Sequence, residues 1–189
     1  GTAALGTVVV FLGAWCSTRL RVARGVAPAL HAMAMLPMAV PGLVLGLGYI
    51  LFYNAPANPL HSLYGSLTLL VFCSVAHFYT TAHLTAVTAL RQLDADFEAV
   101  AASLKVSVWR TLWRVILPAC LPAVLEIARY FFVSAMTTVS AVIFLYTPDT
   151  VLASVAVLNM DDAGDTAAAA AMATLIVLSS ALVCGVFAL

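Results

Sequence analysis

The chain has 189 residues, of which 64% are hydrophobic and 8% charged, and its mean hydropathy is +1.09. A soluble domain carries roughly 25% charged residues, so this composition excludes an ordinary soluble fold and favours a protein that lies in lipid. The formal net charge is zero, and no basic stripe alternates with aromatic residues, which excludes nucleic acid as a partner.

The length and the apolar runs predict several membrane crossings. At about 20 residues per crossing, a chain of this size accommodates about five or six spans with their loops. We expect an all-α polytopic membrane protein of about five spans, forming a single domain over residues 1–189 that is truncated at both ends. The expected spans are 2–17, 33–53, 65–88, 119–145 and 166–189.

The second expected span, 33–53, is rich in proline and glycine. Pro37 and Pro41 interrupt the backbone ladder, and Gly42 and Gly46 form a small-xxx-small pair. In a helical membrane bundle such residues permit close backbone approach, so we expect this segment to pack tightly on a neighbour.

Two histidines, His77 and His83, lie in the third expected span. They are six residues apart, so one helix does not present both on a single face as a metal pair. The sequence leaves open whether they are polar residues facing the bundle or parts of a proton path. The four cysteines are scattered without a CxxC pair, and no metal site is predicted.

The stretch 94–122 is the one polar, amphipathic segment between long apolar runs. Its first half predicts a helix that Asp94 caps, with carboxylates in the first turn and a stripe at i, i+3, i+4 and i+7 formed by Phe97, Val100, Ala101 and Leu104. Such a helix either enters a groove of a soluble protein or lies on lipid.

A second short helix is expected directly after it. Ser107 is its predicted cap, and Pro118 and Pro122 interrupt the backbone beyond it. The same four-point apolar spacing recurs at Trp109, Leu112, Trp113 and Ile116.

Charge asymmetry predicts the orientation. Seven of the eight basic residues lie either at Arg19, Arg21 and Arg24 or between Arg91 and Arg114, two regions that alternating crossings place on one side. The positive-inside rule makes that side cytoplasmic, residues 94–116 included. The acidic segment 146–165 then faces outward, as a solvated rim or a contact for another protein, and Asp165 is the expected cap of the last span.

The stretch 94–118 resembles the EAA loop of the permease subunits of binding-protein-dependent type I ABC importers. Ala101, Ser103-Leu104, Trp109-Arg110-Thr111 and Ile116-Leu117-Pro118 match that pattern in register. Three positions depart from it: Ala99 stands where the family has Glu, Val100 where it has Ala, and Lys105 where it has Gly. Glu98, one residue early, is the expected acidic substitute. Lys at 105 is unfavourable if the turn requires positive φ.

The resemblance implies partners and roles. It implies two cytoplasmic ATPases that bind ATP and Mg²⁺, a second permease domain (separate or fused), a periplasmic binding protein, and location in the bacterial inner membrane. The implied coupling residues are Phe97, Glu98, Val100, Ala101, Ser103, Leu104, Lys105, Trp109, Arg110, Leu117 and Pro118. The string from Met136 to Asp165 is similar to the 2-aminoethylphosphonate permease subgroup, with iron(III), sulfate and polyamine permeases as alternatives.

Glu126 and Arg129 are the ionisable pair expected inside a span. At i, i+3 they either pair with each other or offer Arg129 to an anionic substrate on a translocation path.

Catalysis by this chain is not expected, and no cofactor is predicted for it. The sequence has no GxxxxGK[ST] phosphate loop, no G-x-S-x-G and no HExxH. It therefore lacks the motifs that would support an enzymatic function. An ion-coupled secondary transporter using Glu126, His77 and His83 is the other alternative.

Overall fold

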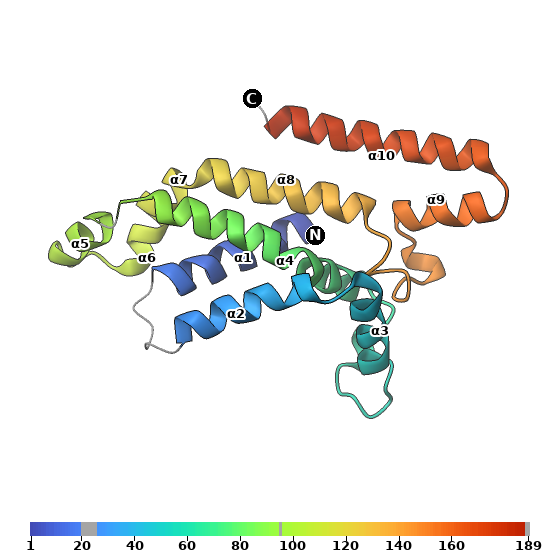
Figure 1. The fold of residues 1–189 in the computed structure, drawn as a ribbon, viewed down its shortest axis with the longest axis horizontal. Coiled ribbons are helices and arrows are strands. Elements are labelled where there is room, and N and C mark those ends of the chain that lie inside the picture. Colours follow the sequence, from blue (N-terminus) through green and yellow to red (C-terminus); the bar gives the residue numbers. More distant parts are fainter. Residues whose placement is uncertain (20–25, 95, 188–189) are drawn as a thin grey trace.

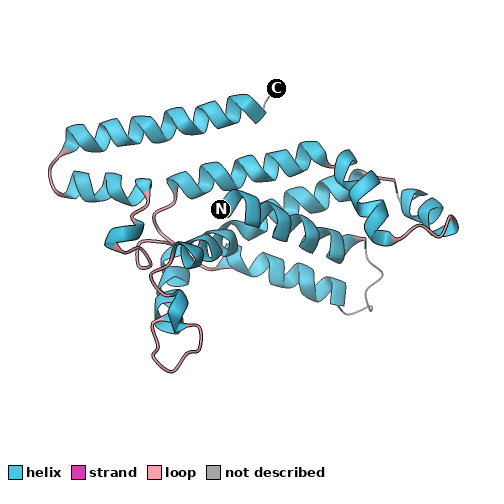
Figure 2. Ribbon diagram, turned by 180° about the vertical axis from the view of Figure 1, so that it is seen from behind, coloured by secondary structure: helices cyan, strands magenta, loops and turns pink. Residues whose placement is uncertain are grey.

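The computed structural model describes residues 1–19, 26–94 and 96–187. These residues form helices joined by turns and contain no strand, as the all-α prediction requires (Figure 2). The α-helices are α1 Thr2–Thr18, α2 Val26–Ala39, α3 Gly42–Tyr53, α4 Leu67–Gln92, α5 Asp96–Ser103, α6 Val108–Thr111, α7 Leu117–Ala119, α8 Leu121–Thr137, α9 Ala153–Asp162 and α10 Thr166–Phe187. Short 3-10 turns cover His61–Leu63 and Pro148–Thr150.

Helix α4 is the centre of the bundle. It packs against α1, α2 and α8, and its apolar side chains close a core with Trp15 of α1 and Phe131 of α8 (Figure 1). Leu90, in the last turn of α4, is fully buried in this core. The third expected span, 65–88, is therefore confirmed as one long helix that begins at Leu67, where the hydroxyl of Ser66 accepts the N–H of Leu69.

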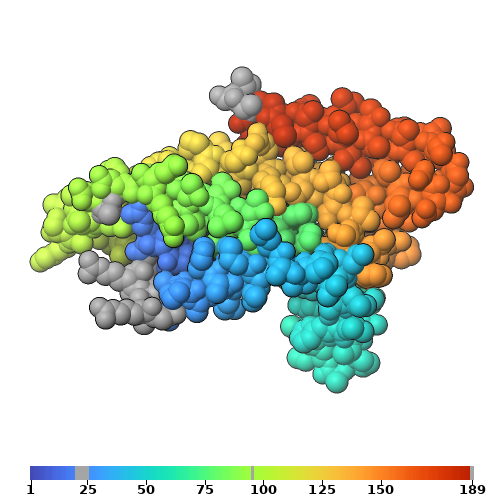
Figure 3. Space-filling view, in the orientation of Figure 1, coloured from blue at the N-terminus to red at the C-terminus, as the bar shows by residue number. Residues whose placement is uncertain are grey.

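The second expected span, 33–53, is not one straight helix. It divides into α2 and α3, which meet at 104°. Pro41 has no N–H to donate and disfavours helical φ and ψ at Val40, so the chain leaves the helix there and restarts at Gly42. As a result α3 projects from the body of the molecule (Figure 1, Figure 3).

The predicted close approach at the glycine pair is confirmed. A Cβ on Gly42 would lie 2.5 Å from Ser140 Oγ, and one on Gly46 would lie 2.6 Å from the backbone carbonyl oxygen of Ala141. At Gly46 the obstacle is backbone, so that position has room only for glycine as the backbone stands, whereas a side chain at Gly42 would have to displace the Ser140 hydroxyl.

The fourth expected span, 119–145, is shorter in the structure. Helix α8 begins beyond a 76° bend that follows α7, and it ends at Thr137, where Thr138 adopts an extended conformation. The expected polar connection 146–165 contains helix α9, which packs against α10 and buries Ser154 and Val155. The Ser154 hydroxyl donates to the Thr138 carbonyl and fastens α9 to the end of α8.

Among the described residues, α4 and α10 are long and apolar enough to cross a membrane singly, and up to four crossings result if each bent pair counts as one. Helix α1 is apolar but shorter. Together with α1, these segments correspond to the five expected spans, two of which are bent where prolines interrupt the helix. Asp165 caps α10 as predicted, since its Oδ1 accepts the N–H of Ala168 at 3.1 Å.

Candidate functional site

The predicted loop lies at one end of the bundle, where α4 ends and α5 and α6 begin (Figure 1). The first predicted helix is confirmed as α5, slightly shorter than 94–104. Asp94 assists its start, because Oδ1 accepts the N–H of Asp96 at 3.0 Å. Near the other end, the hydroxyl of Ser103 donates to the Val100 carbonyl at 2.8 Å.

Lys105 adopts the left-handed conformation that ends α5. Its φ is +55°, and no other non-glycine residue among those described has positive φ. The Val106 N–H donates to the Ala101 carbonyl at 2.9 Å, and the Lys105 N–H donates to the Ala102 carbonyl at 3.0 Å. These bonds form a Schellman motif with Lys105 at the position that usually holds glycine. The turn therefore requires the conformation for which the EAA pattern has Gly.

The second predicted helix is irregular. Ser107 lies at the N-cap position of α6 as predicted, but its side chain makes no capping hydrogen bond, and only its carbonyl accepts the N–H of Thr111. A π-helical turn then covers Leu112–Ile116. The Leu117 N–H bonds to the Leu112 carbonyl five residues back, and Pro118 has no N–H with which to continue the usual ladder. Leu117 and Pro118 then open the short helix α7 before the bend.

The expected four-point stripe of this second helix is divided between two faces. Leu112 and Ile116 are buried in the bundle core, whereas Trp109 and Trp113 are largely exposed. The Trp109 ring still contacts that of Trp15, with centroids 5.6 Å apart, and so ties α6 to α1. The prediction of one continuous apolar face was wrong here because the π-helical turn changes the register.

The stripe on α5 is open to its surroundings. Phe97, Val100 and Leu104 are 49%, 55% and 70% exposed. A hollow of about 510 Å³ runs between α5 and the segment from Val106 to Val115, with Ala101 in its wall and Arg110 and Arg114 along its side. An apolar patch rimmed by charged residues is typical of a surface that a partner covers.

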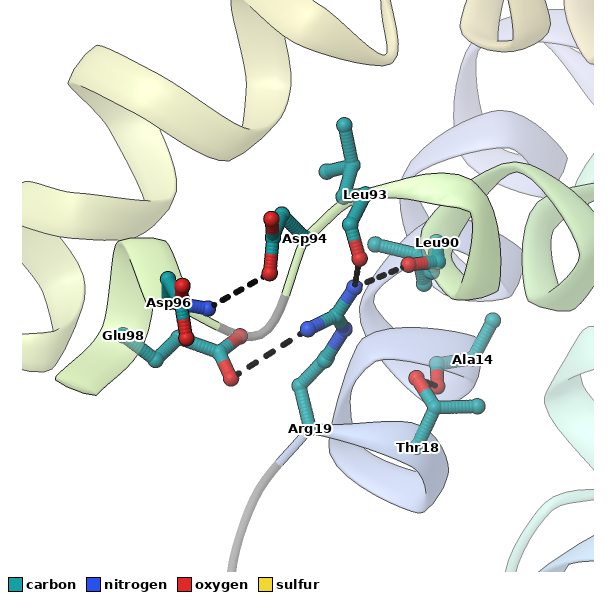
Figure 4. Close-up of polar contacts among 8 residues, drawn as sticks. All are labelled: Ala14, Thr18, Arg19, Leu90, Leu93, Asp94, Asp96 and Glu98. Atoms are coloured by element: carbon teal, nitrogen blue, oxygen red, sulfur yellow. Dashed lines mark hydrogen bonds and ion pairs between the residues drawn. The ribbon is translucent and has the colours of Figure 1, made fainter.

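Arg19, at the end of α1, fastens this end of the bundle (Figure 4). Its Nη2 donates to the carbonyl oxygens of Leu90 and of Leu93, the latter at 2.6 Å, and its Nη1 lies 3.4 Å from Oε2 of Glu98. The cationic group thus meets the negative end of α4 and a carboxylate of α5. Sequence reasoning assigned Arg19 only to a basic cluster, and the other members, Arg21 and Arg24, lie outside the described residues.

Glu126 and Arg129 pair on α8, as one of the two sequence hypotheses expected. Both side chains are partly exposed in this chain, so the expectation of an interior pair is corrected. Their spacing of three residues places them on neighbouring positions of one helix face. A role in a translocation path stays a prediction.

The histidines of α4 lie in the bundle interior. His83 is buried and has no hydrogen-bond partner for either ring nitrogen among the described residues, and its ring centroid is 5.8 Å from that of His31 on α2. His77 packs edge-on against Phe78. Across the described ranges, no three side chains from His, Cys, Asp and Glu converge as metal ligands.

The fold and the loop define a polytopic helical membrane protein that presents an amphipathic two-helix loop at one end of an apolar bundle. The chain belongs to the family described as binding-protein-dependent transport system inner membrane component, which matches residues 9–189. It is therefore a multi-pass protein of the inner membrane, and the family resemblance drawn from the loop is confirmed.

Curated relatives carry more specific descriptions. The chain is 40% identical over 122 residues to a putative ferric transport system permease protein of Haemophilus influenzae, a match that covers 64% of this chain and 19% of the relative. It is 34% identical over 148 residues to a ferric transport system permease protein of Actinobacillus pleuropneumoniae, covering 78% of this chain and 21% of that protein. The chain thus spans about a fifth of the length of these two relatives.

A third relative is a putative ferric transport system permease-like protein of Escherichia coli, 34% identical over 86 residues. That match covers 46% of this chain and 72% of the relative. The 2-aminoethylphosphonate subgroup receives no support from these relatives, and the iron alternative fits them better.

Proposed function

We propose that this chain is a permease domain of an ATP-driven importer and that residues 94–118 are its coupling loop for a cytoplasmic ATPase dimer. The observation that carries the proposal is the exposed stripe of Phe97, Val100 and Leu104 on a helix that a Schellman turn at Lys105 holds beside α6. Membership of the binding-protein-dependent transport family supports it independently.

The energetics favour a protein groove as the occupant. Full burial of an apolar side chain contributes about 1.5–3 kcal/mol, so three such residues supply a substantial part of an association free energy. The rim of the hollow carries charges of both signs, Asp94 and Asp96 on one side and Arg110 and Arg114 on the other, which favours a protein whose polar groups surround an apolar pocket. A helix lying on lipid needs no such hollow.

The proposed mechanism transmits movement from ATP to the spans. ATP and Mg²⁺ bind to the partner ATPases, whose closure displaces α5 and α6. Because Leu112 and Ile116 are packed in the bundle core, the displacement passes into α1, α4 and α8. A second permease domain, separate or fused, completes the path, and a periplasmic binding protein delivers the solute at the opposite end.

For the substrate we propose iron(III), the cargo named for the relatives, in place of the phosphonate first inferred. Glu126 and Arg129 are the proposed ionisable residues beside the path. A carboxylate is a suitable transient ligand for a hard cation, whereas Arg129 suits an anion that accompanies it. Sulfate, polyamine and 2-aminoethylphosphonate are the competitors to test against iron(III) for binding to the periplasmic binding protein.

The experiment is reconstitution of the full complex in liposomes with and without its ATPase, using the binding protein loaded with ⁵⁵Fe(III). We expect uptake only with the ATPase and ATP inside. Uptake driven by a pH gradient without any ATPase would identify an ion-coupled secondary transporter and refute the proposal. Retention of 2-aminoethylphosphonate by the binding protein, without retention of iron, would refute the substrate.

The orientation has its own test. In a background without native cysteines, Ser107→Cys is expected to react with an impermeant maleimide only from the cytoplasmic side and Asp162→Cys only from the periplasmic side. Reaction of the 162 cysteine from the cytoplasm alone would overturn the topology.

A further inference from the structure

Helix α5 has little holding it to the bundle. None of its described residues is buried, and it packs mainly on α6. In the described part of the chain, the ion pair between Arg19 and Glu98 is the one side-chain hydrogen bond or salt bridge that joins α5 to another helix. The orientation of the exposed stripe on α5 therefore depends on few contacts.

The two ends of this link differ in their environment. The Arg19 side chain is 10% exposed and is fixed by the Leu90 and Leu93 carbonyl oxygens at the end of α4. The Glu98 side chain is 33% exposed and reaches Arg19 across 3.4 Å. Figure 4 shows the guanidinium between the α4 carbonyls and the carboxylate. Arg19 is therefore held in place by α4. A substitution at Glu98 breaks the ion pair to α5 but leaves the hydrogen bonds from Arg19 to α4 intact.

We propose that Arg19 is a positioning residue that acts through Glu98 to fix the rotation of α5, and with it the direction in which the apolar stripe faces. Arginine suits this task because its planar fork donates to several acceptors at once, here two carbonyls and a carboxylate. The residue joins the ends of α1 and α4 to α5, so a movement of α5 is passed to both helices. This inference rests on the proposed function for its consequence in transport, but the geometry of the link stands without it.

The test uses Glu98→Gln, which removes the carboxylate charge and leaves the bonds from Arg19 to α4 in place. Asp96→Asn is the matched control, since it removes one carboxylate charge from the same helix and Asp96 has no ion-pair partner among the described residues. Arg19→Lys is the second variant: an ammonium keeps the charge but lacks the fork that bridges α4 and Glu98.

Two quantities are measured in the assembled complex. The first is the distance distribution between spin labels at Thr88→Cys on α4 and Ala102→Cys on α5, in a background without native cysteines. The second is the amount of solute transported per ATP hydrolysed. We expect Glu98→Gln and Arg19→Lys to broaden the distribution and to lower the coupling ratio several-fold, while Asp96→Asn leaves the distance distribution unchanged.

A distribution in Glu98→Gln that matches the wild type would overturn the proposal. A loss of coupling with an unchanged distribution would also overturn it, because Glu98 would then act by direct contact with the partner. If the wild-type chain failed to retain any ATPase, the proposed function would fail, and the label distances in the chain alone would still decide whether the link positions α5.

Discussion

Replacing Lys105 by glycine is expected to stabilise the turn between α5 and α6. A left-handed conformation costs an L-residue about 1–2 kcal/mol, and glycine adopts it freely but loses about 0.5–1 kcal/mol more backbone entropy on ordering. With φ of +55° at Lys105, the difference leaves about 0.5–1 kcal/mol in favour of Gly. That value corresponds to a roughly two- to fivefold increase in protection of the turn amides, provided they exchange by local opening.

Hydrogen exchange of the chain without its partner measures this directly. The reporting amides are those of Lys105 and Val106, which donate to the Ala102 and Ala101 carbonyls. We expect protection to rise in Lys105→Gly, to stay near wild type in Lys105→Ala, and to fall in Lys105→Val, because β-branched residues are least tolerant of positive φ. Equal protection in the Gly and Val variants would show that the turn does not select for positive φ at residue 105.

The same variants separate conformation from contact in the assembled importer. If Lys105 serves only as the turn residue, ATP-driven uptake holds or improves in Lys105→Gly and is unchanged in Lys105→Ala. If its ammonium binds the ATPase, both variants lower coupling, and restoring the family's residue brings no gain.

The remaining predictions concern the spans. Gly46→Ala places a methyl group 2.6 Å from the Ala141 carbonyl oxygen and is expected to cost about 1–3 kcal/mol of stability, seen as a lower unfolding temperature in detergent. Gly48→Ala is the control, because no atom lies within 4 Å of a Cβ at that position and a Gly→Ala change in a helix stabilises the fold by about 1 kcal/mol. A loss of stability in Gly48→Ala equal to that in Gly46→Ala would contradict the packing argument. Glu126 and Arg129 are partly exposed but lie on the apolar helix α8, so removing either leaves an unpaired charge on a membrane segment and is expected to lower the folded yield, while changing both to Gln restores it. Restored yield with transport lost favours a substrate role for the pair, and full transport in the double variant rules that role out.

Local signals in the sequence predicted the parts of the site that depend on neighbouring residues. The spacing of Phe97, Val100 and Leu104 gave the exposed stripe of α5, and the acidic cap at Asp165 gave the start of α10. Both follow from helix geometry and from the unpaired N–H groups at helix starts. These depend only on residues close in sequence, so a short window of sequence is enough to predict them. The departure from glycine at Lys105 likewise marked the one described non-glycine residue with positive φ.

Features that depend on contacts distant in sequence were missed or placed wrongly. The link from Arg19 to Glu98 joins residues 79 positions apart, and no local pattern marks it. Pro41, Pro118 and Pro122 were recognised as interruptions, but a proline marks where a helix bends and not by how much, so the angles of 104° and 76° were not predicted. The π-helical turn Leu112–Ile116 contains both Trp113 and Ile116, and it shifts the helical register by too little for the 3.6-residue period of the sequence pattern to reveal it.

The stripe of α5 is proposed to enter a groove of the ATPase, and the Ala101→Asp variant distinguishes this docking from a helix that rests on lipid. Ala101 lines the hollow beside Phe97 and Leu104, whereas Ala102, one residue on, is exposed and does not line it. Both lie in the last turn of α5, so an aspartate at either position meets the same end of the helix dipole.

The measurement is the amount of ATPase that copurifies with each variant in detergent. A carboxylate buried in an apolar groove without a partner costs several kcal/mol. We therefore expect Ala101→Asp to lose the ATPase and Ala102→Asp to retain it, with equal insertion of both chains in the membrane. Normal copurification and ATP-driven uptake by the Ala101→Asp protein would show that the stripe does not enter the ATPase and would favour a helix that rests on lipid.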